Sequence, residues 1–295
     1  MSAEARLPAV TPLGPDSVAW QVVGDRRLLL GAGTALLLQV AHPVVGAGVH
    51  DHSNYTEDPW GRLDRTIDSL LSQVFGGQEA IAEAERLREL HKAIKGVDHH
   101  GERYHALNPE AYRWVHGSTF WTTVRMRELF IHPLPREEKR RFYAEWRHLG
   151  LILGLREHHM PPDLEGFEAY FDDVVANRLE DNHTVRELLD SITMRDTPPP
   201  PWWFLPEALW RPVRPAGGNV LTLCAIGLLP PALRDRLGLK WTNADERHLR
   251  RLGAATRAAG NRVPDRLRLY PKAYLATRRR RPERPWRRCS ARATG

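Results

Sequence analysis

The amino-acid sequence predicts one mostly α-helical domain, and three observations favour this fold class. Helix-start and helix-stop residues recur along the chain, and no segment alternates apolar and polar residues over more than four positions. No internal repeat is visible. The chain has 295 residues, 42% of them hydrophobic and 27% charged, which is typical of a globular protein. We therefore expect a single all-α domain whose core is large enough to need no disulfide or structural metal.

Local signals place most of the helix boundaries. The first predicted helix ends at His42-Pro43, because proline cannot continue the hydrogen-bond ladder. Residues 44–58, which follow, are expected to form a loop. Asp58 and Pro59 start the second helix as N-cap and first helical residue. Residues 198–203, rich in proline and tryptophan, are expected to form a rigid loop. The predicted helices cover residues 25–41, 58–75, 78–95, 109–130, 136–154, 164–178, 220–229, 231–237 and 244–260.

The positive charge of the chain is concentrated at its C-terminus. The whole chain has a formal net charge of +7, and residues 278–295 contain eight arginines and one acid. The rest of the chain is therefore formally neutral, which argues against nucleic-acid binding by the folded body. We expect residues 1–24 to be an extension and residues 25–277 to be the domain. Residues 278–295 are expected to be a disordered tail able to contact an acidic partner.

The sequence also indicates in which cellular compartment we expect the protein. The first 15 residues lack the apolar core of a signal peptide, and the most apolar stretch, residues 28–41, is too short and too interrupted to span a membrane. Only two cysteines occur, so a disulfide scaffold is excluded. We expect a reducing, cytoplasmic location. Signatures of nucleotide loops, zinc proteases, serine hydrolases and redox dithiols are absent from the sequence.

A polar edge is predicted on the helix that begins at Asp58. On a helical wheel, Arg65 and Thr66 each fall within about 60° of Arg62, beside an apolar face. A solvated edge explains this spacing by itself. An alternative is a cationic edge that holds an anionic group of a cofactor.

The next predicted helix has a histidine in its apolar stripe. Ile81, Ala84, Leu87, His91 and Ile94 share one face, and His91 is the only ionisable group among them. Burying an imidazole costs free energy unless its nitrogens find partners. A core histidine bonded to a backbone carbonyl is one interpretation. A neutral imidazole offered to a metal or haem iron is the other.

These residues lie within a longer pattern that resembles the MpaB-type oxygenase family, which is related to the catalytic domain of latex-clearing rubber oxygenases. The resemblance covers about residues 25–276 and is specific for the family rather than for one reaction. The segments that resemble the family are residues 36–43, 48–53, 58–66, 90–96, 104–109, 114–116, 229–241 and 268–271.

The resemblance implies an all-α fold around a non-covalent haem b. By motif, His91 matches the proximal histidine that ligates the iron. Arg62 and Thr66 match the arginine and threonine of the R-x-x-K-T motif near the haem, where they would orient bound oxygen or a haem propionate. The chain departs from the motif at Arg65, which replaces a lysine able to ligate iron. A guanidinium offers no lone pair, so the sixth position should be open or water-filled.

The resemblance therefore implies a haem b-dependent oxygenase with molecular oxygen as co-substrate. Its substrate would be a small apolar molecule, for example an isoprenoid or another secondary metabolite. One alternative is a non-oxidative proton-transfer enzyme on the same scaffold, with His50, Asp51 and His52 near the pocket. Another is a non-enzymatic haem-binding or sensing protein. His50 or His52 could instead capture the iron, and His116 fits the family pattern without an assigned role.

Overall fold

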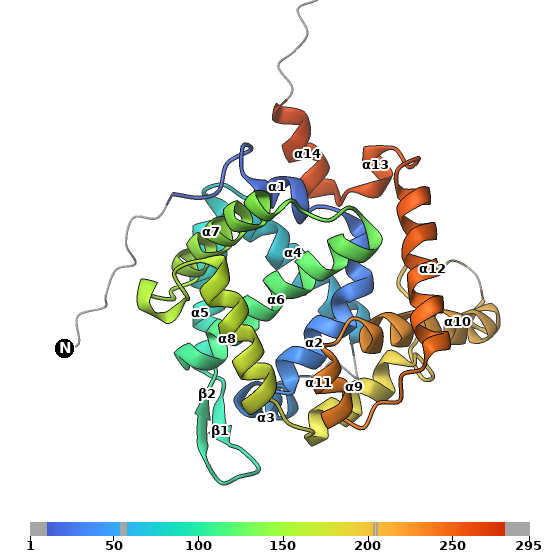
Figure 1. Cartoon of the computed structure of the whole chain (residues 1–295), viewed down its shortest axis with the longest axis horizontal. Coiled ribbons are helices and arrows are strands. Elements are labelled where there is room, and N and C mark those ends of the chain that lie inside the picture. Colours follow the sequence, from blue (N-terminus) through green and yellow to red (C-terminus); the bar gives the residue numbers. More distant parts are fainter. Residues whose placement is uncertain (1–10, 54–57, 203, 205, 281–295) are drawn as a thin grey trace, which may run out of the picture.

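The computed structural model describes residues 11–53, 58–202, 204 and 206–280, and this part of the chain is predominantly α-helical (Figure 1). The all-α prediction is confirmed, with one small two-stranded antiparallel hairpin as an addition. The elements are α1 (Val18–Val22), the 3-10 helix η1 (Arg26–Gly31), α2 (Ala32–Val40), α3 (Pro43–His52), α4 (Pro59–Phe75), α5 (Glu79–Lys92), β1 (Lys95–Val97), β2 (Arg103–His105), α6 (Pro109–Phe130), α7 (Arg136–Ile152), the 3-10 helix η2 (Glu157–His159), α8 (Leu164–Asn177), α9 (His183–Ile192), α10 (Glu207–Gly227), α11 (Pro231–Arg236), α12 (Asn243–Gly260), α13 (Asp265–Arg268) and α14 (Pro271–Arg280).

The interior is built around α6 and α2, which lie in the middle of the view in Figure 1. Helices α7 and α8 cover one side, and α10 and α12 cover the other. Where α6, α7 and α8 meet, Phe120, Phe142 and Phe167 pack ring against ring and are almost fully buried. Aromatic side chains of this size remove a large apolar area from water, so this cluster contributes strongly to stability.

Helices whose first residues carry strong local start signals were predicted correctly. The Asp58 carboxylate accepts a hydrogen bond from the Gly61 N–H, and Pro59 is the first residue of α4. Asn108 caps α6 in the same way, ahead of Pro109. The predictions for α7, α8, α11 and α12 are correct to within about two residues at each end.

The predicted helix over residues 25–41 is wrong in its first turns. Residues Arg26–Gly31 form a 3-10 helix, and the α-helix starts only at Ala32. Helix α6 crosses closely at this junction, because a Cβ built on Gly31 would lie 2.5 Å from Met126 Cγ. The apolar pattern indicated burial correctly but could not show this change of helix type.

The predicted loop over residues 44–58 is also wrong, because Pro43–His52 form α3. Pro43 ends the preceding helix and starts the next one, where proline is well accommodated. The two glycines that suggested a loop serve packing instead. A Cβ on Gly46 would lie 2.8 Å from Asn182 Nδ2, so α9 can approach the α3 backbone only because this residue is glycine.

The predicted helix over residues 78–95 ends earlier, at Lys92, and a hairpin that was not predicted follows. Strands β1 and β2 pair Gly96 with Tyr104, and the Tyr104 hydroxyl donates a hydrogen bond of 2.5 Å to Asp51 on α3. In the turn, the Asp98 carboxylate accepts from the backbone N–H groups of His100 and Glu102. Strands of three residues are too short to show a periodicity.

The region between α8 and α11 contains more helix than expected. Helix α9 was not predicted, and α10 begins at Glu207 rather than at residue 220. Proline inside a helix normally argues against it, and α10 contains Pro212 and Pro215. Both prolines are exposed, so water can hydrate the carbonyls that lose their N–H partners.

The structure corrects the start of the expected disordered tail, because Arg278 and the next two residues belong to α14. The Arg278 guanidinium lies over the Tyr274 ring, 5.9 Å from the ring centroid. The rest of the tail, residues 281–295, lies outside the described residues. Helix α14 itself is anchored on α4, since Ala273 is 1% exposed and Lys272 Nζ bonds Asp68 and Ser72.

Deleting residues 281–295 should leave folding and cofactor binding intact. We expect the thermal midpoint to stay within about 2 °C of the full chain, because removing surface charge usually changes stability little. A matched truncation from residue 271 removes α14 and its contacts with α4, and it should lower the midpoint clearly. Differential scanning calorimetry measures the thermal midpoints of the two truncated chains. A drop of many degrees in the shorter deletion would show that residues 281–295 pack on the fold.

Within the described residues, no single helix is long and apolar enough to cross a membrane. The segments Arg26–Val40 and Pro43–His52 satisfy the length and composition criteria only together, as a pair bent by 107°.

Candidate functional site

The predicted site residues lie on one helical hairpin, formed by α4 and α5. The short connection between the helices includes Gly77, whose φ of +55° lies in the left-handed region that favours glycine. The apolar face of α4 is buried at Leu71 and Val74, as the helical wheel predicted. On α5, Ala84 is fully buried in the same core. Packing thus fixes both helices and leaves their other edges for polar side chains.

His91 lies in the last turn of α5 and is half-buried rather than enclosed in the core. Its Nδ1 lies 2.6 Å from the backbone carbonyl oxygen of Leu87, one turn earlier. A carbonyl oxygen only accepts, so Nδ1 must bear the proton and donate it. In the neutral ring, Nε2 then keeps its lone pair. The ring edge meets the Tyr112 ring of α6 at 5.8 Å between centroids, which holds the imidazole in place.

The three α4 residues have different surroundings. Arg65 is 63% exposed, and its Nη1 lies 3.0 Å from Asp58 Oδ2 at the helix start. This ion pair and the Gly61 N–H hold the pKa of the Asp58 carboxyl below its usual range. The exposed Thr66 hydroxyl donates to the Arg62 carbonyl at 2.9 Å, and Arg62 itself is half-buried. The polar edge is thus partly solvated, as its spacing alone suggested.

One hydrogen bond sets the alignment of the two helices. Ser69 Oγ donates to Glu83 Oε1 at 2.5 Å across the hairpin. Arg62 lies seven residues before Ser69, and His91 lies eight residues after Glu83. At 1.5 Å per residue these steps are about 10 to 12 Å along each helix, both away from the connecting turn. The Arg62 turn and the His91 turn therefore lie at the same level, at the open end of the hairpin.

A cavity of about 360 Å³ adjoins this region. Tyr112, whose ring contacts His91, lines the cavity together with Arg88 of α5, and burial raises the pKa of the Tyr112 hydroxyl. Sequence reasoning missed Tyr112, although its position in the first turn after Pro109 could have suggested burial beside the hairpin. The remaining lining residues come from the segment before α6 and from the end of α7 onward.

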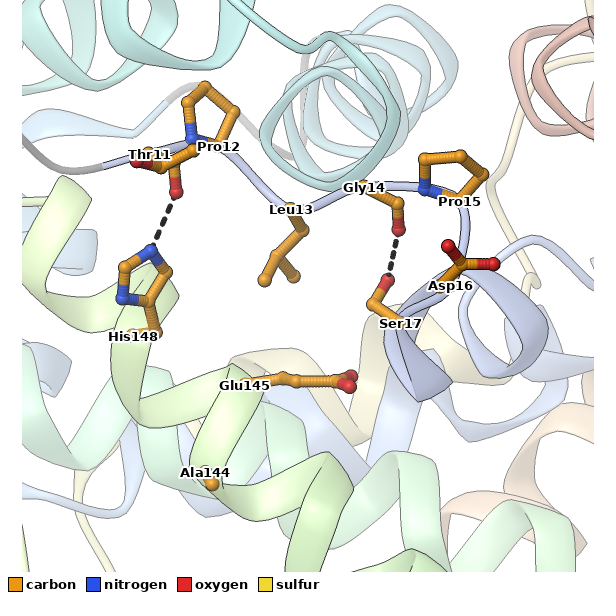
Figure 2. A pocket seen from close by; sticks show the side chains of 10 residues that line it. All are labelled: Thr11, Pro12, Leu13, Gly14, Pro15, Asp16, Ser17, Ala144, Glu145 and His148. Carbon is orange, nitrogen blue, oxygen red and sulfur yellow. Dashed lines mark hydrogen bonds between the residues drawn. The ribbon is translucent and has the colours of Figure 1, made fainter. Parts of the chain in front are cut away.

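A second cavity, of about 490 Å³, lies between α7 and the segment that leads into α1 (Figure 2). Its polar groups already have structural partners. The two Glu145 oxygens accept from the Val18 and Ala19 N–H groups at 2.9 and 2.8 Å, capping α1. His148 Nε2 lies 2.6 Å from the Thr11 carbonyl oxygen. None of the predicted site residues lines this cavity, and its polar contacts stabilise the N-terminal segment.

The other singled-out histidines have partners of their own among the described residues. His50 lies beside His183 and Glu187 of α9. His52 Nε2 lies 3.3 Å from the Lys95 carbonyl. His116 is buried and donates from Nε2 to the Trp146 carbonyl at 2.7 Å, while Trp146 donates back to the His116 carbonyl. Burial lowers the pKa of His116 to about 4, so this neutral ring joins α6 to α7.

His42 is a further residue that sequence reasoning treated only as a helix stop. It is 6% exposed, and Nδ1 has no hydrogen-bond partner within the described residues. Burial lowers its pKa, with the charges of Glu110, Arg178 and Glu180 acting around it. The signal for it was the buried helix that runs directly into His42-Pro43.

Residues 20–258 match the family described as the catalytic domain of ER-bound oxygenase mpaB/B' and rubber oxygenase, and the chain belongs to that family. The suspected resemblance is therefore confirmed, and the general activity is that of an oxygenase.

Two relatives are similar over most of their length. The uncharacterized protein Rv2237 of Mycobacterium tuberculosis and the uncharacterized protein Mb2261 of Mycobacterium bovis are each 26% identical to this chain over 237 residues. The match covers 78% of this chain and 88% of each relative. No solved structure matches the chain.

Proposed function

We propose that this oxygenase uses haem b, held by His91, to add molecular oxygen to a small apolar substrate of isoprenoid or secondary-metabolite type. The observation that supports the proposal most directly is the 2.6 Å contact between His91 Nδ1 and the Leu87 carbonyl. It fixes the tautomer and the ring orientation that an axial iron ligand requires.

The residues present fit the chemistry of a haem. A haem needs one axial base, cations for two propionates and apolar surroundings. His91 offers the base through Nε2, and Arg62 and Arg65 are cations at the same end of the hairpin. Leu71 and Val74 bury the apolar face of α4 behind them. The donor set is complete without any residue from outside the hairpin.

The bound haem would supply the reduction and activation of O₂. The side chains of the chain would position the reactants around it. The Leu87 carbonyl keeps the Nδ1 proton of His91 in place, and Tyr112 prevents the ring from turning. Arg62 and Thr66 would orient an oxygen atom or a propionate by hydrogen bonds. The single hydroxyl proton of Thr66 is donated to the Arg62 carbonyl, so Thr66 would donate to a bound group only after its hydroxyl turns away from that carbonyl.

The cavity beside Tyr112 is a candidate place for the substrate, with both apolar and charged side chains in its lining. Leu107, Pro109, Leu153 and Leu155 contribute apolar side chains to its lining. An apolar molecule that enters it would release water from these surfaces, which favours binding. The positive charges of Arg88 and Arg156 at the same cavity would suit a polar end group on such a molecule.

The visible spectrum of the purified full chain, oxidised and dithionite-reduced, tests the cofactor. We expect a Soret band that shifts on reduction and a haem content of about one per chain. Oxygen uptake with candidate apolar alkenes then tests the reaction. Turnover under strict exclusion of O₂ would favour a proton-transfer enzyme. An iron whose six ligand positions are all occupied, and which therefore binds neither O₂ nor CO, would favour a haem-binding sensor.

Replacing Arg65 tests whether the position opposite His91 is open. The wild-type ferric haem should give a high-spin spectrum and bind cyanide or imidazole without a slow opening step, because a guanidinium offers no lone pair. Asp58 would compete for a lysine introduced at this position. The sharper variant is therefore Asp58→Asn with Arg65→Lys, since asparagine keeps the N-cap.

We expect this double variant to shift toward a low-spin spectrum, because lysine, unlike arginine, can give up its proton and offer iron a nitrogen lone pair. The matched control is Asp58→Asn with Arg65→Leu, whose side chain has no atom that can ligate iron and which should remain high-spin. A low-spin bis-histidine spectrum in the wild type, lost on replacing His50 or His52, would contradict the open site.

A further inference from the structure

Three side chains on two helices converge away from the hairpin of α4 and α5. His50 lies in the last turn of α3, and His183 and Glu187 lie one turn apart on α9. One ligand atom from each residue lies within 4.8 Å of the other two. We propose that His50, His183 and Glu187 form a site for a divalent transition-metal ion of the zinc class, independent of the haem.

The distances fit a shared ion better than hydrogen bonding. His50 Nδ1 and His183 Nδ1 each lie 3.5 Å from the same Glu187 oxygen, Oε2. Around a tetrahedral zinc ion with ligand distances of about 2.0–2.2 Å, neighbouring ligand atoms are about 3.3–3.6 Å apart. The two imidazole rings meet edge to face, with 4.9 Å between their centroids. Two of the three distances between donor atoms therefore match the spacing of ligands of one ion, and the third lies within 4.8 Å.

The backbone around these ligands is fixed by buried contacts. Asn182 Nδ2 donates to the Val40 carbonyl at 2.8 Å, and the Thr184 hydroxyl donates to the Gly46 carbonyl at 2.9 Å. Both anchors are buried, and His183 lies between them in sequence. The start of α9 is therefore held against α3 before any ion binds. A site formed in this way loses little conformational entropy on binding.

The donor set decides the class of ion. Two imidazoles and one carboxylate suit zinc and its neighbours, whereas Ca²⁺ and Mg²⁺ prefer a shell of oxygen ligands. The side chains of His50 and His183 are 49% and 70% exposed, so an ion can enter and water can supply the fourth ligand. The bound ion would link α3 to α9, which are more than 130 residues apart in the chain at these positions.

A second histidine cluster provides the internal control. His99 and His100, in the hairpin turn, lie 3.1 and 2.9 Å from different oxygens of Glu180. The His100 contact is an ordinary hydrogen bond, whereas the Glu180 Oε1 beside His99 has no hydrogen-bond partner among the described residues. Because the contacts from His99 and His100 go to different oxygens and are shorter than the spacing of zinc ligands, we expect this cluster to bind zinc more weakly than the first.

The test uses the full, haem-loaded chain with any affinity tag removed. Isothermal titration with Zn²⁺ should show one ion per chain, and Co²⁺ should give the visible absorption of a tetrahedral site. At about 100 times the dissociation constant, zinc should raise the thermal midpoint by about 3 °C or more. Mg²⁺ at the same concentration should give no shift.

The variants His183→Gln and Glu187→Gln should each weaken zinc binding at least about tenfold, whereas His100→Gln should leave it unchanged. The haem spectrum should be the same in all three. Absence of a saturable zinc site in the wild type would overturn the proposal. If His100→Gln lost zinc binding while His183→Gln kept it, the ion would be bound at the second cluster, and this result would also overturn the proposal.

Discussion

His91→Ala should lose its haem. Removing the proposed iron ligand should lower the haem content of the purified chain at least about tenfold and abolish oxygen uptake, because Nε2 of His91 is the base that would hold the iron. The chain itself should still fold, since His91 is only half-buried and its one hydrogen bond is within α5. Haem per chain, measured by pyridine haemochrome, and the Soret position are the readouts.

Lys92→Ala is the matched control for this variant. Lys92 is the next residue on the same turn of α5, and its Nζ bonds Glu89 at the surface. Its loss should leave haem content and spectrum unchanged. Imidazole added to His91→Ala should restore part of the spectrum by filling the space of the missing ring. Wild-type haem content and spectrum in His91→Ala would show that the ligand is another residue.

Asp25→Asn should cause the largest loss of stability. The Asp25 side chain is 3% exposed and pairs with Arg27 at 2.7 Å and with Arg268 at 3.0 Å. Arg27 donates to Asp25 through its backbone N–H as well. Removing the charge leaves two arginines without their shared anion, which we expect to cost about 3 kcal/mol of unfolding free energy. The thermal midpoint should fall by roughly 6–12 °C.

Asp265→Asn is the control for this prediction, because Asp265 pairs with the same Arg268 but is 55% exposed. A surface pair contributes about 0–1 kcal/mol, so this variant should lose little. Denaturant unfolding measures the free energy of unfolding of both variants, provided that their m-values equal that of the wild type. Equal losses in the two variants would show that the burial of Asp25 is not the cause.

The contribution of Asp25 also depends on pH. Burial disfavours the charged carboxylate, but the bonds from Arg27 and the charges of Arg27 and Arg268 outweigh it and lower the pKa below its usual 3.8. The folded state therefore binds this proton less readily than the unfolded state. The stability difference between wild type and Asp25→Asn should be constant at neutral pH and shrink as pH falls below about 4.

The hairpin of α4 and α5 was predictable because its determinants are local. Asp58 and Pro59 start α4 by their own hydrogen-bonding and steric properties, and the apolar spacing on α4 shows which face is buried. His91 stood out because an ionisable group interrupts an apolar stripe. Its bond to the Leu87 carbonyl, one turn away, follows from the same helix.

Other elements depend on contacts that no local pattern shows. Helix α3 contains two glycines, and α10 contains two prolines, so local propensity argued against both. Tertiary packing nevertheless stabilises both segments as helices. Gly46 admits the start of α9, and a Cβ on Gly218 of α10 would collide with the Thr193 backbone. In these segments glycine marks a close helix–helix approach rather than a loop.

By itself, the sequence determined the all-α class, the α4 and α5 helices that bear Arg62, Arg65, Thr66 and His91, and the family. These properties depend on neighbours within a few residues or on a motif along the chain. Only the tertiary structure brought His50 to His183 and Glu187, and Asp25 to Arg268. Such pairs form because buried hydrogen bonds and close packing dock distant helices on one another, and this docking has no period that a sequence can display.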